Sequence, residues 1–310
     1  MKNKAERMRE AFDEMIHRPN HLVAMPIAPD ALSAKICEQE GFECINAAGY
    51  ATNASDLAEP DRGFADFGIM LNKAREVINA VNIPVFCDTD TGYGDSANIA
   101  RTIRSYEAIG AAGCFIEDQT WPKRCGHMAN KSVVSADEMV ARLKAALNAR
   151  KHKNYMIMAR TDARAVYDLD EAIRRAHLYK EAGADIIFIE APQNIDELKR
   201  IVKEFPDTPL LANMLEGGKT PLVDLEDLRK LGFSLSAHPT ALTYGQVYSD
   251  KEIADDLLKN GSTKDSINHM ITFSKFNQIV GLDQVNAREA MYSDQKMQDK
   301  IDNWKKAGEL

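Results

Sequence analysis

The sequence contains no long apolar run. Its 310 residues are 45% hydrophobic and 28% charged. No apolar stretch approaches the roughly 18 residues that would cross a bilayer. The N-terminal stretch MKNKAERMREAFDEMIHRP carries acidic as well as basic residues, so it fits neither a secretory leader nor an acid-poor transit peptide. We therefore expect a globular, cytoplasmic protein that has no membrane partner.

Basic residues are in the minority. The formal net charge is −8, from 39 Lys and Arg against 47 Asp and Glu. Nucleic acid and anionic membranes repel an acidic chain, although a local basic site for an acidic substrate is still allowed. We expect no nucleic-acid partner.

Cysteine is sparse and its spacing suggests no pairing. The five cysteines are an odd number without a CxxC motif, which argues against a disulfide framework and a structural zinc site. Cys44, Cys87 and Cys114 lie in apolar, strand-like runs, where a free cysteine acts as a small hydrophobic residue. Cys125 differs because it lies in the basic stretch KRCGH.

Short apolar runs alternate with segments in which apolar residues recur at the i, i+3, i+4 and i+7 positions of amphipathic helices. Eight such runs occur: HLVAMPI, GFECINAAG, IPVFCDTD, AGCFIEDQ, NYMIMARTD, DIIFIEAP, PLLANM and FSLSAHP. Their even spacing, without a linker, favours a closed (β/α)₈ TIM barrel over a doubly wound open sheet. We predict a single α/β barrel domain over residues 1–310, with a C-terminal helical extension from about residue 262.

Acidic residues follow the third and fourth runs. The third ends in Asp88 and Asp90, and the fourth in Glu117. The carboxyl ends of barrel strands meet at one rim, so these carboxylates would repel one another unless a cation holds them. Such oxygen ligands suit Mg²⁺ or Mn²⁺. Any one of these acids alone would more often cap a helix, but the group of three predicts a metal site.

Later strand ends carry groups that can bind a carboxylate. Arg160 follows an apolar run directly, and its planar guanidinium can hold a substrate carboxylate through two hydrogen bonds. Asn213 offers a neutral donor for the same task, and Glu190 can orient the arginine or contact the substrate. The alternatives are a surface salt bridge for Arg160 and a turn role for Asn213.

The stretch KRCGH gathers Lys123, Arg124 and His127 around the thiol of Cys125. It lies on a long loop after the fourth run, because a capping-box pattern that starts at Ser135 begins the next helix. Basic neighbours are expected to lower the pKa of the thiol and make it available for proton transfer. The alternative is a loop cysteine with solvated neighbours.

Together these motifs resemble the isocitrate lyase and phosphoenolpyruvate mutase superfamily, within it the methylisocitrate lyases and the 2,3-dimethylmalate or 2-alkylmalate lyases. The likeness runs from about residue 20 to residue 290 and includes DALSAKI, DTDTGYG, IEDQ, PKRCGH, ARTDA, IEA and NMLEGGKTPL. It implies a TIM barrel whose last helix is swapped between subunits, usually in a homotetramer. It also implies Mg²⁺ held, largely through water, by Asp88, Asp90 and Glu117.

The same resemblance implies roles for single residues. Arg160 would bind a substrate carboxylate, and Cys125 would be the catalytic acid or base, with Gly126 beside it in contact with the substrate. A further metal-contacting aspartate follows the second strand in the family. The stretch EPDRGFADFG offers Asp61 and Asp66, and we favour Asp66 because ADFGI aligns better.

One stretch departs from the family pattern. Family members usually carry serine or threonine and then glycine after the second strand, as in SGYG, where the α-keto acid portion of the substrate binds. Here AAGYA places Ala48 and Gly49 at those positions, and Ala51 replaces a glycine. The backbone amides of Gly49 and Tyr50 can still bind substrate, but a hydroxyl donor is missing.

We predict a Mg²⁺-dependent carbon–carbon lyase that cleaves a 2-hydroxy dicarboxylate of the 2-methylisocitrate or dimethylmalate type. Retro-aldol, Claisen-type cleavage would give an α-keto acid such as pyruvate and a carboxylate. Positive charge on Lys123, Arg124 and His127 would stabilise the developing dianion, and Cys125 would protonate its carbon. The resemblance favours a lyase because the mutase branch lacks the cysteine. An oxaloacetate hydrolase that releases oxalate and acetate, and a non-catalytic barrel that only binds a dicarboxylate, stay open.

Overall fold

Eight parallel strands form the centre of the computed structural model, which describes residues 2–292 and 297–307. The strands are β1 (Val23–Pro26), β2 (Ile45–Ala47), β3 (Val85–Asp88), β4 (Gly113–Glu117), β5 (Met156–Thr161), β6 (Ile186–Ile189), β7 (Leu211–Asn213) and β8 (Leu235–His238). Each lies within one of the apolar runs that the sequence presents.

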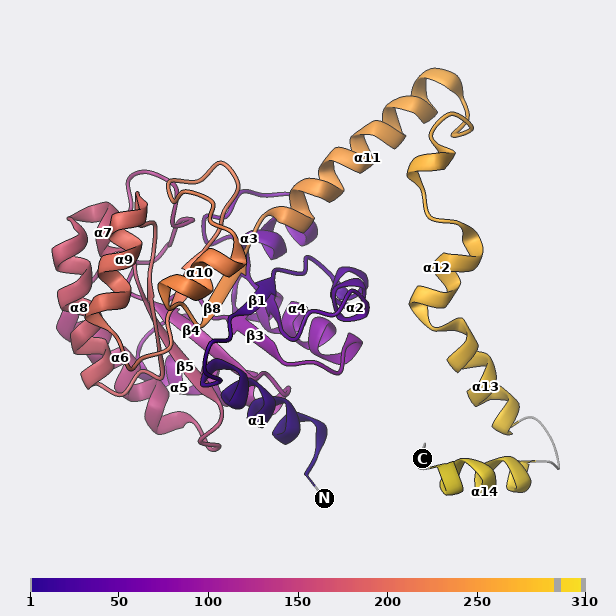
Figure 1. Cartoon of the computed structure of the whole chain (residues 1–310), viewed down its shortest axis with the longest axis horizontal. Coiled ribbons are helices and arrows are strands. Elements are labelled where there is room, and N and C mark those ends of the chain that lie inside the picture. The colour runs from indigo at the N-terminus through magenta and orange to yellow at the C-terminus, as the bar shows by residue number, and fades with distance from the viewer. Residues whose placement is uncertain (1, 293–296, 308–310) are drawn as a thin grey trace. The chain divides into compact units, whose positions relative to one another are not determined.

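The strands pair in parallel all the way round. One set runs β2-β3-β4-β5-β6, and the other runs β1-β8-β7. Single parallel bridges, Ile27 to Asn46 and Ile187 to Leu210, join the two sets at both edges. The sheet is therefore closed, and the predicted TIM barrel is confirmed (Figure 1).

Helices separate the strands along the chain and cover the outside of the barrel (Figure 1). In the barrel part they are α1 (Lys4–Ile16), α2 (Ala31–Gln39), α3 (Gly49–Thr52), α4 (Phe67–Ala80), α5 (Ser96–Ala108), α6 (Ala136–Ala149), α7 (Ala163–Val166), α8 (Leu169–Glu181), α9 (Ile195–Glu204) and α10 (Leu225–Leu231). Many begin at an acidic, amide or hydroxyl side chain that accepts a first-turn N–H, as Ser135 does from Glu138 3.1 Å away.

Apolar side chains pack on both sides of the barrel wall and so fix the carboxyl ends of the strands, which form the rim of the barrel. Side chains such as Ile157 and Ile187 face outward and pack against the helices, in the larger core cluster. Alternate strand residues, such as Met158 and Phe188, fill the barrel interior together with Phe12 of α1. The predicted core cysteines Cys44, Cys87 and Cys114 are all buried, which leaves the carboxyl ends of the strands as the place for polar chemistry.

The chain divides into two compact units, Met1–Val247 and Tyr248–Leu310, with the boundary inside α11 (Ala241–Asn260). The described part of the second unit is helical and holds α12 (Phe273–Val280), α13 (Leu282–Tyr292) and α14 (Met297–Ala307). A single domain with an extension from about residue 262 stays a prediction, as does the swap of the last helix between subunits. In the described ranges, no helix is both long and apolar enough to span a membrane.

Candidate active site

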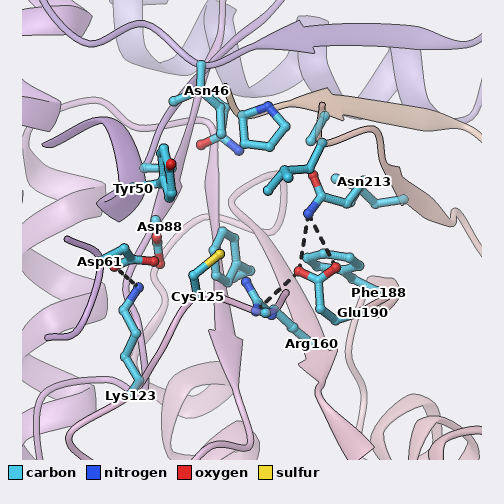
Figure 2. Close-up of a pocket in the computed structure, with 18 residues that line it drawn as sticks. Asn46, Tyr50, Asp61, Asp88, Lys123, Cys125, Arg160, Phe188, Glu190 and Asn213 are labelled. Carbon is cyan, nitrogen blue, oxygen red and sulfur yellow. Dashed lines mark hydrogen bonds and ion pairs between the residues drawn. The ribbon is translucent and has the colours of Figure 1, made fainter. Parts of the chain in front are cut away.

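A pocket opens where the carboxyl ends of the strands converge (Figure 2). The space in and above it amounts to about 550 Å³, a volume that includes the open mouth. Residues of the strands and of the segments that follow them line it: Ile27, Asn46, Ala48, Tyr50, Asp61, Asp88, Phe115, Lys123, Cys125, Gly126, Arg160, Phe188, Glu190, Leu211, Asn213, Leu215, Ala237 and Pro239. The structure therefore brings most of the predicted site residues to one cavity.

Carboxylates gather on one side of the pocket around a buried ammonium group. The Nζ atom of Lys123 lies 2.7 Å from Asp61 Oδ1 and 2.8 Å from Asp90 Oδ1. Asp88 accepts hydrogen bonds of 2.8 Å from the backbone amides of Gly49 and Asp90. Burial alone would lower the pKa of Lys123, but the acids around it raise that pKa well above its usual value, so the lysine is a cation.

Asp90 is held close to this cation by its backbone as well as by its charge. It follows β3 with a positive φ of 46°, in the left-handed region that few non-glycine residues adopt. Burial raises the pKa of Asp90 to about 7, because the nearby carboxylates of Asp88 and Asp61 add to the effect and Lys123 offsets only part of it. The cluster is thus short of positive charge.

Glu117 is a second carboxylate whose buried charge is not fully compensated. Both of its carboxylate oxygens are buried without a hydrogen-bond partner, and the nearest cationic atom is Arg160 Nε at 3.4 Å. Burial raises its pKa well above the ordinary value, against the opposing charge of Arg160. A buried acid without hydrogen bonds is costly unless a further group satisfies it.

These acids fit a divalent ion that keeps much of its water. Among the described residues, no three side chains of His, Cys, Asp or Glu converge closely enough to hold a metal directly. Mg²⁺ commonly takes only one or two carboxylates and keeps several waters. Asp88 lines the pocket and the carboxylate of Glu117 has no hydrogen-bond partner, so the donor set suits such an ion.

Asp66, predicted as a metal contact, lies elsewhere. Its side chain is exposed and caps α4, where it accepts hydrogen bonds from Gly68 at 2.8 Å and Ile69 at 3.0 Å. Asp61 is buried instead, lines the pocket and pairs with Lys123. The structure thus places Asp61, and not Asp66, at the pocket, and the helix-capping position of ADFGI accounts for Asp66 locally. A metal contact by either aspartate stays a prediction.

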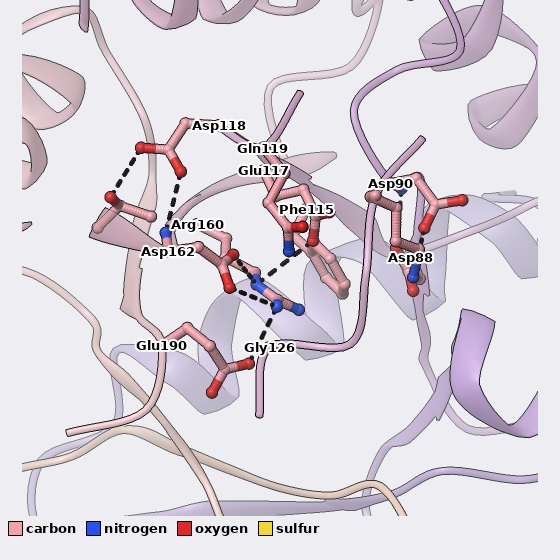
Figure 3. Close-up of polar contacts among 12 residues, drawn as sticks. Asp88, Asp90, Phe115, Glu117, Asp118, Gln119, Gly126, Arg160, Asp162 and Glu190 are labelled. Carbon is pink, nitrogen blue, oxygen red and sulfur yellow. Dashed lines mark hydrogen bonds and ion pairs between the residues drawn. The ribbon is translucent and has the colours of Figure 1, made fainter. Parts of the chain in front are cut away.

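Arg160 lies on the other side of Cys125 from Asp61 (Figure 2), and its polar contacts are drawn in Figure 3. Asp162 accepts from its Nε at 2.9 Å and from its Nη2 at 3.2 Å, and Nη2 also lies 3.2 Å from Glu190 Oε2. The guanidinium lies 5.2 Å from the ring centre of Phe188. These contacts hold Arg160 in one orientation at the pocket wall, as a carboxylate-binding residue requires.

Glu190 joins Arg160 to two further groups. Asn213 Nδ2 donates to its two oxygens at 3.3 and 3.2 Å, and His127 Nε2 lies 3.2 Å from Oε1. Burial alone would raise the pKa of Glu190, but Arg160 and His127 hold that pKa well below its usual range. Glu190 is therefore an ionised residue that orients the arginine.

Cys125 lies between the acidic side and the arginine side (Figure 2). Its backbone amide donates to the carbonyl of Asp61 at 3.1 Å. Burial raises the pKa of the thiol to about 11, and the charges of Asp61 and Glu190 reinforce that direction. The predicted fall in pKa was wrong, because burial outweighs the backbone amide of His127 and the charge of Arg160, which act to lower the pKa. The thiol stays protonated at neutral pH, as a proton donor must be.

Two of the basic sequence neighbours of Cys125, Arg124 and His127, are not among the residues that line the pocket. Arg124 lies outside the pocket lining, and its Nη1 donates to the carbonyl of Ala129 at 3.3 Å. His127 accepts at Nδ1 from the backbone amide of Lys219 at 2.8 Å, which leaves the ring proton on Nε2, toward Glu190. Neither residue lines the pocket, and their role in stabilising a developing dianion stays a prediction.

The stretch after β2 that departs from the family pattern lies at the pocket. Ala48 lines the pocket and precedes α3 without a capping side chain, and Ala51 is buried behind it. The amide of Gly49, predicted to bind substrate, already donates to Asp88. Tyr50 lines the pocket, and its hydroxyl lies 2.9 Å from that of Tyr244.

Three residues of the site were not assigned from the sequence. Asp61 was considered and passed over, whereas Asp162 and Lys131 stand in the motifs ARTDA and NK without a predicted role. Both have buried side chains and lie 2.8 Å apart. A polar residue directly after a strand, as in ARTD, was the signal that could have identified Asp162.

A parallel barrel with acids, an arginine and a thiol at its rim defines an α/β-barrel enzyme site for small carboxylates. The chain belongs to the family described as phosphoenolpyruvate phosphomutase, which matches residues 12–255, within the phosphoenolpyruvate mutase and isocitrate lyase superfamily. The predicted superfamily is thereby confirmed.

Proteins named as lyases and as mutases are similar to this chain. It is 40% identical to 2,3-dimethylmalate lyase of Eubacterium barkeri, covering 94% of this chain and 99% of that protein. It is 43% identical to the chloroplastic carboxyvinyl-carboxyphosphonate phosphorylmutase of Arabidopsis thaliana, over 94% and 86%. It is 35% identical to 2-methylisocitrate lyase of Aeropyrum pernix, over 90% and 89%. The lyase names agree with the predicted enzyme class.

Solved structures show the same architecture. A crystal structure of 2,3-dimethylmalate lyase superimposes with a TM-score of 0.87 at 30% identity, covering 94% of this chain and 96% of that one. A structure of oxaloacetate acetylhydrolase in complex with 3,3-difluorooxalacetate gives 0.85 at 29% identity, over 91% and 96%. The fold is therefore shared by enzymes of more than one activity.

Proposed function

We propose that this chain is a divalent-metal-dependent carbon–carbon lyase that cleaves an alkyl-substituted 2-hydroxy dicarboxylate of the 2,3-dimethylmalate type into pyruvate and a carboxylate. The observation that carries the proposal is the protonated thiol of Cys125 in the pocket, between the acids around Lys123 and the guanidinium of Arg160. The identity to 2,3-dimethylmalate lyase over nearly the whole length of both proteins supports this substrate class.

The two sides of the pocket divide the binding task. Arg160, oriented by Asp162 and Glu190, binds one substrate carboxylate. Asp88, Asp90, Glu117 and Asp61 would hold the divalent ion, Mg²⁺ or Mn²⁺, which as a Lewis acid polarises the 2-hydroxyl and its neighbouring carboxylate. The role of a metal rests here on the buried, unsatisfied carboxylate of Glu117.

The chemistry needs one proton to move between two substrate atoms. Breaking the C2–C3 bond turns the 2-hydroxyl into a ketone, releases its proton and leaves the electron pair on C3. Cys125 gives its proton to C3, and the proton from the hydroxyl restores the thiol, so no proton is gained or lost overall. The ammonium of Lys123, buried beside the acids, stabilises negative charge as it develops.

The apolar wall supports an alkylated substrate. Ile27, Leu211 and Leu215 line the pocket together with its polar groups. Methyl groups on C2 or C3 of a malate gain from burial against such side chains, at roughly 0.8 kcal/mol per methylene-sized group. Oxaloacetate carries no alkyl group and gains nothing from this wall.

An oxaloacetate hydrolase is the second candidate. It is favoured by the TM-score of 0.85 to oxaloacetate acetylhydrolase, nearly equal to the value for the lyase. In that reaction the same site would add water to the ketone and release oxalate and acetate.

A substrate screen separates the candidates. Purified protein with Mg²⁺ is incubated with 2,3-dimethylmalate, 2-methylisocitrate, isocitrate, 2-alkylmalates and oxaloacetate, and pyruvate, glyoxylate and oxalate are quantified. We expect pyruvate from a methylated malate. Oxalate from oxaloacetate, without pyruvate from any malate, would establish the hydrolase instead. Thermal stabilisation by malates without any turnover would indicate a barrel that only binds dicarboxylates.

A further inference from the structure

Lys131 is a buried lysine outside the pocket lining. Its side chain is 2% exposed, and its Nζ lies 2.8 Å from Asp162 Oδ1 and donates to the carbonyl of Gly126. Removing an ammonium group from water costs several kcal/mol unless its partners compensate. These two contacts compensate the cost of burying the charge of Lys131.

Asp162 gives Lys131 a rigid anchor. Asp162 is fully buried, and its backbone amide donates to Asp118 Oδ1 at 2.9 Å (Figure 3). Its carboxylate also accepts from Nε and Nη2 of Arg160. Burial alone would raise the pKa of Asp162, but Arg160 and Lys131 lower it, so the carboxylate is ionised and pairs with both cations.

Gly126 gives Lys131 its second contact, next to the proposed proton donor. A Cβ atom at position 126 would lie 2.4 Å from Glu190 Cγ and 2.6 Å from Arg160 Nη2. The backbone of Gly126 therefore packs directly against the arginine and its partner, where only glycine fits. Cys125 precedes Gly126, so the position of this peptide sets where the thiol stands.

We propose that Lys131 is a positioning residue that ties the Cys125 loop to Arg160 through Asp162, and so holds the thiol in register with a carboxylate bound at that arginine. The inference rests on the proposed function for its catalytic consequence only. The loop has another anchor on its N-terminal side, where the amide of Cys125 donates to Asp61. Lys131 supplies the link from Gly126 to the Asp162 carboxylate that also holds Arg160.

The test compares Lys131→Met with Lys144→Met in the full-length protein. Lys144 is exposed on α6 and serves as the matched control. The first measurement is the rate at which iodoacetamide alkylates Cys125 at a fixed pH, followed by peptide mass spectrometry. The other four cysteines are buried and report any general unfolding. Lys131→Met is expected to raise the rate at Cys125 at least about 10-fold, because a released loop exposes the thiol.

The second measurement separates positioning from binding. Lys131→Met is expected to lower kcat by about 10²-fold, the cost of a displacement of about 1 Å, while KM changes little because Lys131 does not contact substrate. Lys144→Met is expected to match wild type in both measurements. Alkylation of Cys125 at the wild-type rate in a folded Lys131→Met protein overturns the proposal, whatever happens to kcat.

A second variant covers the case in which Lys131→Met does not fold. If circular dichroism shows that Lys131→Met is unfolded, Lys131→Gln, which keeps an N–H donor and loses the charge, is measured in its place. Faster alkylation in folded Lys131→Gln supports the proposal, and the wild-type rate refutes it. If the wild-type protein turns over none of the malates, the proposed function fails, but the alkylation comparison still decides the role of Lys131.

Discussion

Asp61 and Lys123 form a buried ion pair of 2.7 Å between the loop after β2 and the loop after β4. Both side chains line the pocket. The pair joins two loops that are distant in sequence, and it places Asp61, five residues before the helix cap Asp66, in the candidate active site.

Asp61 and Asp66 offer a matched pair of variants. Asp61→Asn is expected to lower turnover about 10- to 100-fold, the usual cost of removing a group that supports a metal site. Asp66→Ala should leave kcat/KM unchanged and lower the free energy of unfolding by about 1 kcal/mol, the value of a helix cap. Steady-state kinetics and urea unfolding test both. The reverse pattern would restore Asp66 to the site.

Activity is expected to require a divalent ion. EDTA should abolish turnover, Mg²⁺ or Mn²⁺ should restore it, and Asp88→Ala should lower it by at least about 10²-fold even with excess metal. The physical reason is the uncompensated negative charge that Asp88, Asp90 and Glu117 bring together. Full activity after exhaustive chelation would show that no metal takes part.

Cys125→Ser is expected to separate proton transfer from binding. A serine hydroxyl is a far weaker acid than a thiol, so kcat should fall at least about 10²-fold. The affinities for Mg²⁺ and pyruvate, measured by calorimetry, should change little because other residues provide those contacts. A kcat near the wild-type value would remove Cys125 from the mechanism.

The pKa of Cys125 predicts a particular pH profile for alkylation of the metal-free protein. Because burial raises the thiol pKa to about 11, the thiolate is a minor form throughout the neutral range. The alkylation rate should therefore rise about tenfold per pH unit from pH 7 to pH 10, without a plateau. A plateau below pH 8 would show a thiol activated by its basic sequence neighbours.

Ala48→Ser decides between two explanations of the departure after β2. If the alanine only lacks a hydrogen bond to an α-keto acid, serine should tighten pyruvate binding by about 0.5–1.5 kcal/mol. We favour a remodelled pocket, since Ala51 also departs from the family pattern and is buried beside it. In that case kcat/KM on the true substrate should fall while the Kd for pyruvate barely changes. Tighter pyruvate binding with undiminished kcat/KM would contradict our choice.

Local sequence was sufficient for the barrel and its rim. Alternating apolar runs and helical patterns predict the eight strands, because burial on both faces of a parallel strand leaves a readable apolar run. Residues at the carboxyl ends of strands, such as Asp88 and Arg160, fall at the pocket because the strand itself fixes their position. The superfamily followed from the motifs at these same places.

Residues on long loops could be assigned only from the folded chain. KRCGH suggested a thiol among three cations, but Lys123 pairs with acids, and Arg124 and His127 lie outside the pocket lining. The direction of a pKa shift depends on burial and on charges from other strands, and neighbours in sequence do not determine these. The local capping pattern accounts for Asp66, but only the folded chain shows that Asp61 pairs with Lys123 at the pocket.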